Sequence, residues 1–310
     1  MKRNSVLVIG SANLDMVVAT ERFPKSGETM FANKFQMFPG GKGANQAVCC
    51  SKLGGEVHFL GKIGNDIFGE RLRKSMESDG VDLRYLLTDI EESTGLAFIT
   101  VDDSGQNQII VISGSNKNLS PSDIEESKRL FELTNLTLLQ LEVPLETVIR
   151  AAELARQHGH IVILNPAPAR NLPGRLLKLV DYLTPNETEA EILTGISVND
   201  KDSATRAAKE LIREGVSTVI ITLGDKGSIL VTPGKTEIFP AMNVIAVDTT
   251  AAGDAFNGAL AYLIAAAGKV EDAVRFATNV AAFSVTRIGA QPSMPTQKEL
   301  KEFLSREVHI

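Results

Sequence analysis

Short runs of apolar residues alternate along the chain with segments in which apolar residues recur every three or four positions. The unbroken apolar character of the runs is typical of strands that are covered on both faces. In one segment between two runs, Phe68, Leu72 and Met76 fall on one side of a helix and charged residues on the other. This alternation predicts a mostly parallel sheet with helices on both faces. The predicted strands are residues 5–10, 57–64, 136–143, 160–167, 180–186 and 217–224.

Two segments, residues 16–38 and 94–113, lack the helical period. Each is predicted to form two strands around a turn, and their alternation suggests one apolar and one polar face. We therefore expect a single α/β domain over residues 1–310, with a small sheet built from these two excursions. Such a sheet could serve as a lid over a site or as an interface between subunits. After residue 250 the chain is predicted to be almost wholly helical as far as Pro292.

The composition narrows the class of protein. The 310-residue chain is 43% hydrophobic and 23% charged, an ordinary profile for a soluble globular protein. Its net charge of −6 argues against binding to nucleic acid or a membrane surface. Cys49 and Cys50 are adjacent, which suits neither a disulfide framework nor a metal site. The short apolar run near the N-terminus predicts a strand rather than a signal peptide, and no run reaches the roughly 18 apolar residues of a membrane span. We expect a cytoplasmic protein.

Polar residues gather where the predicted strands end. Asn13 and Asp15 follow the first strand, and Glu142 lies at the end of the strand at 136–143. In open α/β sheets, ligands bind outside the carboxyl ends of the strands. The recurrence of polar residues at these ends predicts a small-molecule site. The later residues of this kind are Asn186, Glu189, Thr222–Gly227, Asp248, Thr250 and Asp254.

Two glycine-containing stretches stand at predicted helix starts. Residues 39–48, Pro-Gly-Gly-Lys-Gly-Ala-Asn-Gln-Ala-Val, suggest close approach of the backbone to a ligand. They match neither the P-loop nor the dinucleotide fingerprint, whose sixth position is here Gln46. In residues 248–267, Asp254 follows Gly253 at the start of a long apolar helix. Asp254 is either a helix cap or an acid beside an anion that is bound by the free backbone N–H groups.

These stretches together resemble the ribokinases of the PfkB family of sugar kinases, over essentially the whole chain. The two family signatures resemble residues 40–47 and 248–260, and six further motifs fall in the expected order. The resemblance implies a three-layer α/β/α ribokinase-like fold with a mostly parallel central sheet and a small β-sheet lid. It implies a homodimer joined through the lids, and phosphorylation of D-ribose by ATP at the 5-hydroxyl to give D-ribose 5-phosphate, with Mg²⁺ and an activating K⁺.

The resemblance also implies roles for residues. Asp254 is the expected general base, because a carboxylate at the helix start can accept the proton of the attacking hydroxyl. The N–H groups of Ala251, Ala252 and Gly253 are expected to collect the negative charge on the transferring phosphoryl group. The residues expected to hold the sugar are Asn13, Asp15, Gly41, Lys42, Gly43, Asn45, Glu142 and Asp254.

The nucleotide and the cations have their own expected residues. The chain departs from the family at Thr278, where ribokinases often have Asn or His. The nucleotide is expected to meet Asn186, Thr222, Leu223, Gly224, Asp225, Lys226, Gly227, Gly253, Asp254, Thr278 and Asn279. Glu189 resembles the acid that organises Mg²⁺. The residues that match the loops around a monovalent cation are Asp248, Thr250, Ser284, Arg287, Gly289 and Ser293.

Three other functions stay open from the sequence. One is another PfkB kinase that acts on deoxyribose, fructose or a nucleoside. A second is a nicotinamide-dependent oxidoreductase, against which the missing Gly-x-Gly-x-x-Gly after residues 5–10 counts. A third is a sugar-binding protein without activity, against which the presence of Asp254 counts.

Overall fold

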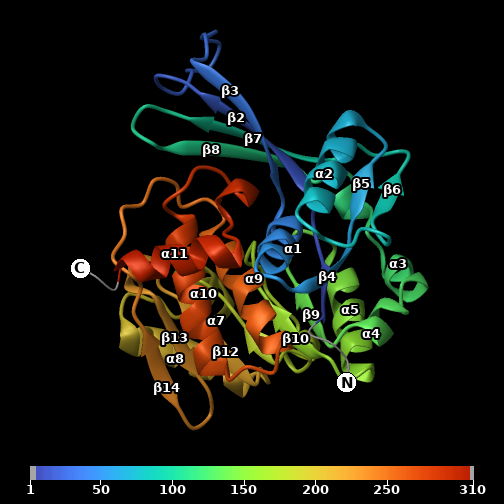
Figure 1. The fold of residues 1–310 in the computed structure, drawn as a ribbon, viewed down its shortest axis with the longest axis vertical. Coiled ribbons are helices and arrows are strands. Elements are labelled where there is room, and N and C mark those ends of the chain that lie inside the picture. The colour runs from blue at the N-terminus through green and yellow to red at the C-terminus, as the bar shows by residue number, and fades with distance from the viewer. Residues whose placement is uncertain (1–4, 308–310) are drawn as a thin grey trace.

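The structure, a computed structural model, describes residues 5–307, and its centre is an eight-stranded sheet (Figure 1). All neighbours from β4 to β12 pair in parallel, whereas β13 and β14 are antiparallel additions at one edge that the sequence pattern did not predict. The strand order is β14 (Thr236–Phe239), β13 (Ser228–Val231), β12 (Thr218–Thr222), β11 (Tyr182–Leu183), β10 (Ile161–Leu164), β9 (Leu136–Leu139), β1 (Ser5–Ile9) and β4 (Glu56–Leu60).

The expectation of one strand over residues 57–64 is wrong. The chain leaves the main sheet after Leu60, and β5 (Lys62–Gly64) pairs instead with β6 (Leu87–Asp89) in a separate two-stranded sheet. Glycine at position 61 permits this departure, because a Cβ there would lie 2.7 Å from the carbonyl oxygen of Gly10.

Two apolar clusters cover the two faces of the main sheet, and successive residues of β1 alternate between them. Val6 and Val8 belong to the first cluster, and Leu7 and Ile9 to the second. The first cluster contains residues of α1 (Lys42–Lys52), α2 (Ile67–Ser78), α9 (Ala252–Ala265), α10 (Val270–Ser284) and α11 (Gln297–Glu307). The second contains residues of α3 (Pro121–Glu126), α4 (Leu130–Leu133), α5 (Leu145–Gln157), α6 (Gly174–Leu177), α7 (Glu187–Thr194) and α8 (Lys201–Arg213). The predicted three-layer α/β/α fold is confirmed.

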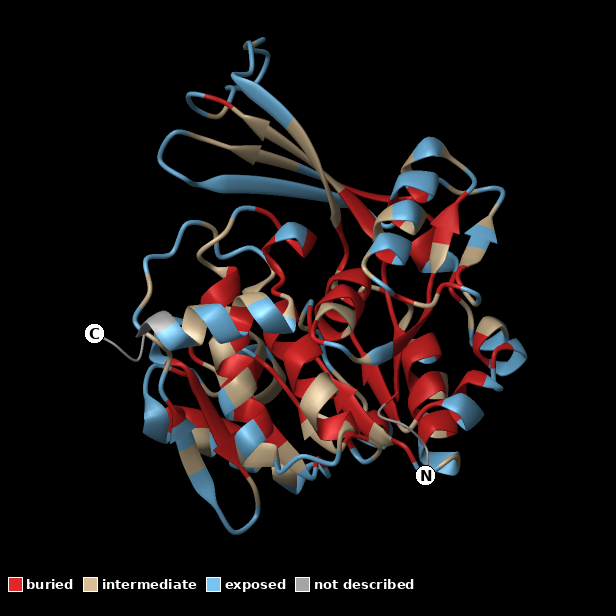
Figure 2. Ribbon diagram, viewed as in Figure 1, coloured by how far each residue is buried: buried red, intermediate tan, exposed pale blue. Residues whose placement is uncertain are grey.

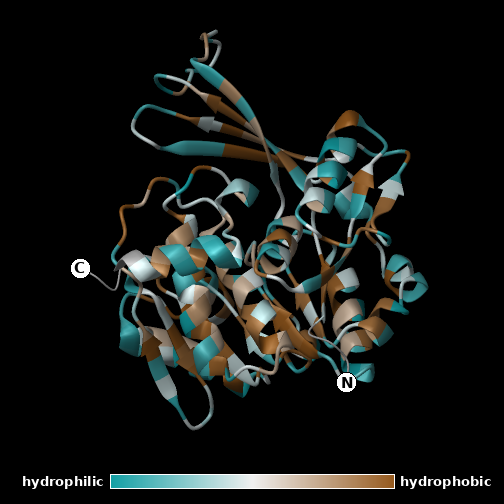
Figure 3. Ribbon diagram, viewed as in Figure 1, coloured by the Kyte–Doolittle hydropathy of each residue, from teal (hydrophilic) through white to brown (hydrophobic). Residues whose placement is uncertain are grey.

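A four-stranded sheet projects from this body (Figure 1). Its order is β3 (Lys34–Gly40), β2 (Asn13–Ala19), β7 (Gly95–Val101) and β8 (Asn107–Ile112), so both predicted excursions contribute two strands each. The edge strand β8 is exposed along its whole length, as Figure 2 shows, and four consecutive residues of it, Ile109–Ile112, are apolar. The strand is coloured hydrophobic there in Figure 3. The expectation of one polar face is therefore wrong for β8, because apolar residues occupy both of its faces.

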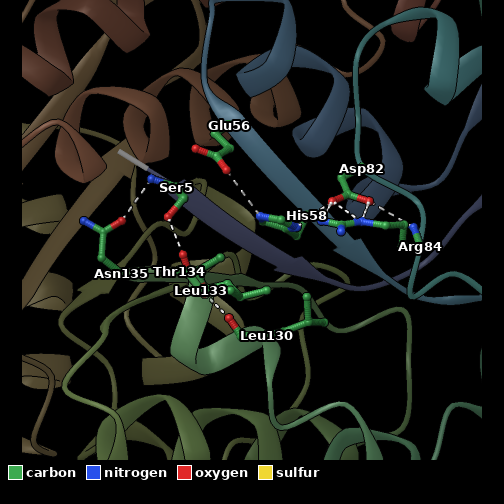
Figure 4. A network of polar contacts seen from close by, with 9 residues as sticks. All are labelled: Ser5, Glu56, His58, Asp82, Arg84, Leu130, Leu133, Thr134 and Asn135. Carbon is green, nitrogen blue, oxygen red and sulfur yellow. Dashed lines mark hydrogen bonds and ion pairs between the residues drawn. The ribbon is translucent and has the colours of Figure 1, made fainter. Parts of the chain in front are cut away.

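Polar contacts join residues near the amino ends of β1 and β9 and around His58 of β4 (Figure 4). Ser5, the first residue of β1, donates its N–H to Asn135 Oδ1 over 3.1 Å and its hydroxyl to the carbonyl of Leu133 over 3.0 Å. The buried His58 ring contacts Asp82 over 2.9 Å. The candidate site lies at the opposite, carboxyl ends of the strands. Within residues 5–307, the helices are all too short or too polar to cross a bilayer.

Candidate active site

A cavity of about 740 Å³ opens at the carboxyl ends of the strands, a volume typical of a small-molecule site. Its wall is formed by loops after β10, β11 and β12 and by the starts of α7 and α9. The predicted site residues that line it are Lys42, Asn186, Glu189, Thr222, Gly224, Asp225, Gly227, Ala251, Ala252, Gly253, Asp254 and Thr278.

Helix α9 begins in the cavity wall without a side-chain cap. Ala251 precedes the helix with φ 59°, in the left-handed region that a non-glycine residue rarely adopts, and no side chain accepts a hydrogen bond from the first turn. The interpretation of Asp254 as a helix cap is therefore wrong. Ala252 donates its N–H to the Thr249 carbonyl over 3.3 Å. The start of α9 still presents the positive end of the helix dipole to the cavity.

The Asp254 carboxylate lies between two amide side chains of α1. Asn45 Nδ2 donates to Asp254 Oδ2 over 2.9 Å, and Gln46 Nε2 donates to Asp254 Oδ1 over the same distance. Burial raises the pKa of Asp254, and Lys42 together with these two hydrogen bonds offsets that effect only in part. For Lys42, burial lowers the pKa, but Asp254 and Glu142 outweigh it, so that the amine remains charged with a pKa above its usual value.

Glu142 holds the start of α1. Its Oε2 accepts hydrogen bonds from the Ser11 hydroxyl over 2.5 Å and from the backbone N–H of Lys42 over 3.0 Å. The turn before the helix requires glycine, because Gly41 has φ 85° and a Cβ there would lie 2.6 Å from the backbone nitrogen of Asn13. Glu142, Lys42 and Asn13 are brought together in this way.

Asn13 and Asp15 lie at the root of the small sheet. Asn13 Oδ1 accepts a hydrogen bond from Asn116 Nδ2 over 2.7 Å, which leaves the Asn13 NH₂ group to donate to a ligand. Asp15 lies over Gly40, where a Cβ would approach its carboxylate oxygens to 2.3 Å. Burial, followed by the charges of Glu142 and Asp254, raises the pKa of Asp15 to about 7.

The opposite part of the cavity is bounded by the start of α7 and by the short helix η2 (Gly224–Lys226). Asn186 and Glu189 form a reciprocal capping box, with Asn186 Oδ1 accepting from the Glu189 N–H over 2.8 Å and Glu189 Oε2 from the Asn186 N–H over 2.9 Å. Burial raises the pKa of Glu189. Leu223 and Lys226 face a separate small recess. Thr278 lines the cavity, and its hydroxyl contacts the Val274 carbonyl and the Ser228 hydroxyl, whereas Asn279 is not part of the cavity wall.

The two loops that resemble a cation site meet at Asp248. Its Oδ1 accepts from the Thr250 N–H over 2.9 Å and its Oδ2 from the Gly289 N–H over 2.8 Å. The Arg287 side chain turns away to pair with Glu299 over 2.8 Å. The Ser284 and Ser293 hydroxyls donate to Ala281 and Ala290, within their own turns. A cation here would have to be held by backbone oxygens.

Sequence reasoning missed part of the site. Gln46, Asn165 and Thr184 form a buried polar network with Asp254, and residues Asn243, Val244 and Ala246 line the cavity. Gln46 carried a usable signal, since a polar residue beside Asn45 on the buried face of an amphipathic helix needs a partner. Residues 241–246 carried none, because an apolar loop has no chemical signature.

Comparisons with known proteins agree over nearly the full length. The model for the pfkB family carbohydrate kinases matches residues 3–297. A ribokinase of Haemophilus influenzae is 44% identical over 302 residues, covering 97% of this chain and 99% of the relative. A deoxyribokinase of Salmonella typhi is 43% identical over 301 residues, covering 97% and 98%. The structure of Arabidopsis thaliana ribokinase complexed with ribose and ATP is similar with a TM-score of 0.92, 35% identity and coverage of 98% and 99%.

Proposed function

Because this chain belongs to the pfkB family of carbohydrate kinases, we propose that it transfers the γ-phosphoryl group of ATP to the 5-hydroxyl of D-ribose. The observation that carries the proposal is the place of Asp254. This buried carboxylate lines the large cavity and also accepts a hydrogen bond from Asn45, on the side of Asn13, Asp15 and Glu142. It thus lies where two substrates would meet. Membership in a kinase family leaves the oxidoreductase alternative without support.

The sugar is held by groups that suit hydroxyls. Asp15 and Glu142 accept, and the NH₂ group of Asn13 donates, so a sugar can be oriented on several hydroxyls at once. The oxygen of the 5-hydroxyl forms a bond to the γ-phosphorus while the bond from that phosphorus to the β–γ bridging oxygen breaks. Asp254 takes the hydroxyl proton, and ADP leaves with the bridging oxygen.

The nucleotide occupies the 740 Å³ cavity, with its phosphates toward the start of α9. The N–H groups of residues 251–253 and the charged amine of Lys42 oppose the negative charge that develops on the transferring group. Among the described residues there is no cluster of three His, Cys, Asp or Glu side chains for a metal. Mg²⁺ usually keeps several waters and is bound by one or two carboxylates together with substrate phosphates. Glu189, in the cavity wall, would be the protein carboxylate here, and the ion would neutralise phosphate charge.

The loops before α9 and at Gly289 form the candidate site for a monovalent cation. Asp248 draws residues 248–250 and the loop at Gly289 together through two backbone N–H groups. We propose that K⁺ binds backbone oxygens of these loops, including those near Ser284, Arg287 and Ser293, and stiffens the backbone before α9. The cation would act by preorganising residues 251–253 and would not touch the phosphates.

2-Deoxyribose is the second candidate substrate. The sequence identities of 44% to a ribokinase and 43% to a deoxyribokinase do not decide which of the two sugars is the substrate. We therefore retain ribose as the main proposal, which the Arabidopsis complex supports, and deoxyribose as its competitor.

The small sheet is proposed to act as a lid and to join two subunits. Ile110 is 69% exposed and Phe98, paired to it in register, is 41% exposed, so apolar surface stands uncovered on this edge. A second copy of the sheet would cover it. Use of ATP as phosphoryl donor is consistent with a cytoplasmic enzyme.

The experiment is a sugar panel combined with Asp254→Asn. ADP release is measured with ribose, 2-deoxyribose, fructose and a nucleoside, and sugar binding is measured by calorimetry. Asp254→Asn should lower kcat by about 10²–10⁴-fold, the usual scale for a lost general base, with ribose affinity nearly intact. ADP release with none of the sugars would overturn the kinase proposal, and normal turnover of the variant would remove Asp254 from the chemistry.

A further inference from the structure

Gln46 uses every hydrogen-bonding atom of its amide. The side chain is fully buried. Its Nε2 donates to Asp254 Oδ1 over 2.9 Å and to Asn165 Oδ1 over 3.0 Å, while its Oε1 accepts from Gln140 Nε2 over 2.7 Å. A buried amide with three partners has no freedom to rotate without breaking a hydrogen bond.

The partners also decide which way the amide faces. A reversed amide would set its oxygen against two acceptors, those of Asp254 and Asn165, and its NH₂ group against the NH₂ group of Gln140. Asn165 is fixed in turn, because its Nδ2 donates to the carbonyl of Thr184 over 3.2 Å. Asn165 therefore holds the donor end of Gln46 toward Asp254, and the NH₂ group of Gln140 binds its acceptor end.

Asn45 and Gln46 are consecutive on α1, and each binds a different oxygen of one carboxylate. We propose that Gln46 is a positioning residue for Asp254, and that Gln140 orients Gln46 for this task. The proposal rests on the proposed role of Asp254 as general base. Gln46 fixes Oδ1 and so holds the plane of the carboxylate, which keeps a lone pair aimed at the sugar hydroxyl. Gln46 itself touches neither substrate.

Most of the ionisable groups around Asp254 are acids, so a neutral hydrogen-bond donor has a specific effect on its carboxylate. The groups that face it are Lys42 and Cys49 from α1, Asp15 from β2, Glu142 after β9 and Glu189 from α7. Only Lys42 is a cation, and burial holds the Cys49 thiol neutral by raising its pKa well above its usual value. The Gln46 N–H therefore stabilises the ionised carboxylate without adding charge. Its loss raises the pKa of Asp254 further, so the base forms only at higher pH.

The test is the pH profile of Gln46→Met and Gln46→Glu. Phosphoryl transfer is measured in single turnovers at saturating ATP and sugar, so that neither product release nor the ionisation of Asp15 sets the rate. The acid limb of the Met variant should move upward by roughly one to two pH units, the effect expected for a lost hydrogen bond to a charged group. The Glu variant should move it at least as far, since two adjacent carboxyls share a proton.

Controls separate positioning from folding. Asn135→Asp, at the opposite edge of the sheet, also replaces a hydrogen-bonded amide by an acid and should lower Tm without moving the acid limb. Gln140→Met should move the limb in the same direction by a smaller amount, and it decides the question if the Gln46→Met protein does not fold.

The outcomes are distinct. An acid limb at the wild-type pH in folded Gln46→Glu and Gln140→Met proteins overturns the positioning role. Normal turnover in Asp254→Asn overturns the general-base assignment instead, whatever the Gln46 variants do. A limb that shifts in the Gln46 and Gln140 variants but stays in place in Asn135→Asp supports the proposal.

Discussion

Gly258 controls how closely the two helices of the site approach each other. It lies one turn after Asp254 on α9, and a Cβ there would be 2.6 Å from the backbone oxygen of Gln46 and 2.7 Å from Cys49 Cβ. Ordinary van der Waals contact begins at 3.4 Å, so Gly258→Ala must separate α9 from α1 by about 0.8 Å. The obstacle on α1 includes backbone, which cannot rotate aside as a side chain would.

This displacement acts on the reaction more than on stability. Overpacking costs about 1–3 kcal/mol, and the better helix propensity of alanine returns about 0.5–1 kcal/mol, so the net loss of stability is about 0–2.5 kcal/mol. In contrast, a shift approaching 1 Å stretches both hydrogen bonds from α1 to Asp254. A misplacement of that size costs on the order of 10²-fold in rate. We expect kcat to fall by about 10–10²-fold while Tm falls by a few degrees.

The assay compares Gly258→Ala with Gly174→Ala. Gly174 begins α6 on the other side of the sheet, and a Cβ there would meet no atom within 4 Å. Turnover is measured by ADP release, and Tm by circular dichroism. The Gly174 variant should keep wild-type values of both. Wild-type kcat in Gly258→Ala would show that the spacing of α1 and α9 does not set the geometry of Asp254, and would refute this reasoning.

Three further predictions follow from the site and the small sheet. The folded pKa of Asp15 is about 7, against 3.8 for a free side chain, so the acid is protonated below pH 7. Ribose affinity measured by calorimetry should therefore fall by up to about tenfold per pH unit below that value. A flat pH profile, like that expected of Asp15→Asn, would contradict this prediction. Turnover should rise when K⁺ replaces a large organic cation at fixed Mg²⁺, and equal rates would reject the cation site at Asp248. Ile110→Lys should convert a dimer to a monomer in light scattering at micromolar concentration, and a wild-type monomer would remove the dimer proposal while leaving the lid possible.

The layers of the fold could be predicted because each element repeats one simple physical pattern. Buried parallel strands are continuously apolar, and the covering helices are apolar on one side. Residues such as Val6–Ile9 and Leu72 therefore indicate both the type of secondary structure and the side that is buried. The antiparallel β13 and β14 escaped prediction because each has only four residues, too few to show a period. The split after Leu60 was missed because β4 and β5 read as one apolar run, whereas the departure depends on space around Gly61.

The candidate site, too, could be predicted from the sequence only in part. Asn13, Asp15 and Glu142 could be placed together because parallel strands end at one edge of a sheet. The pairing of Gln46 with Gln140 could not, since these residues are 94 positions apart and their contact depends on how α1 lies over the sheet. The direction of the Arg287 side chain could not be predicted either, because the neighbouring sequence does not distinguish a side chain that faces the Asp248 loop from one that pairs with Glu299.

The charge balance of the site explains why a nucleotide is expected to bind together with a divalent cation. Asp15, Glu142, Glu189 and Asp254 surround one buried cation, Lys42, and the pKa values of Asp15, Asp254 and Glu189 are all raised. A nucleotide arriving alone would add negative charge and drive these acids further toward their neutral forms, which would disable Asp254 in its proposed role as a base. A nucleotide that arrives with a divalent cation would avoid that effect, and the N–H donors of Asn45 and Gln46 favour the ionised form of the Asp254 carboxylate without adding positive charge.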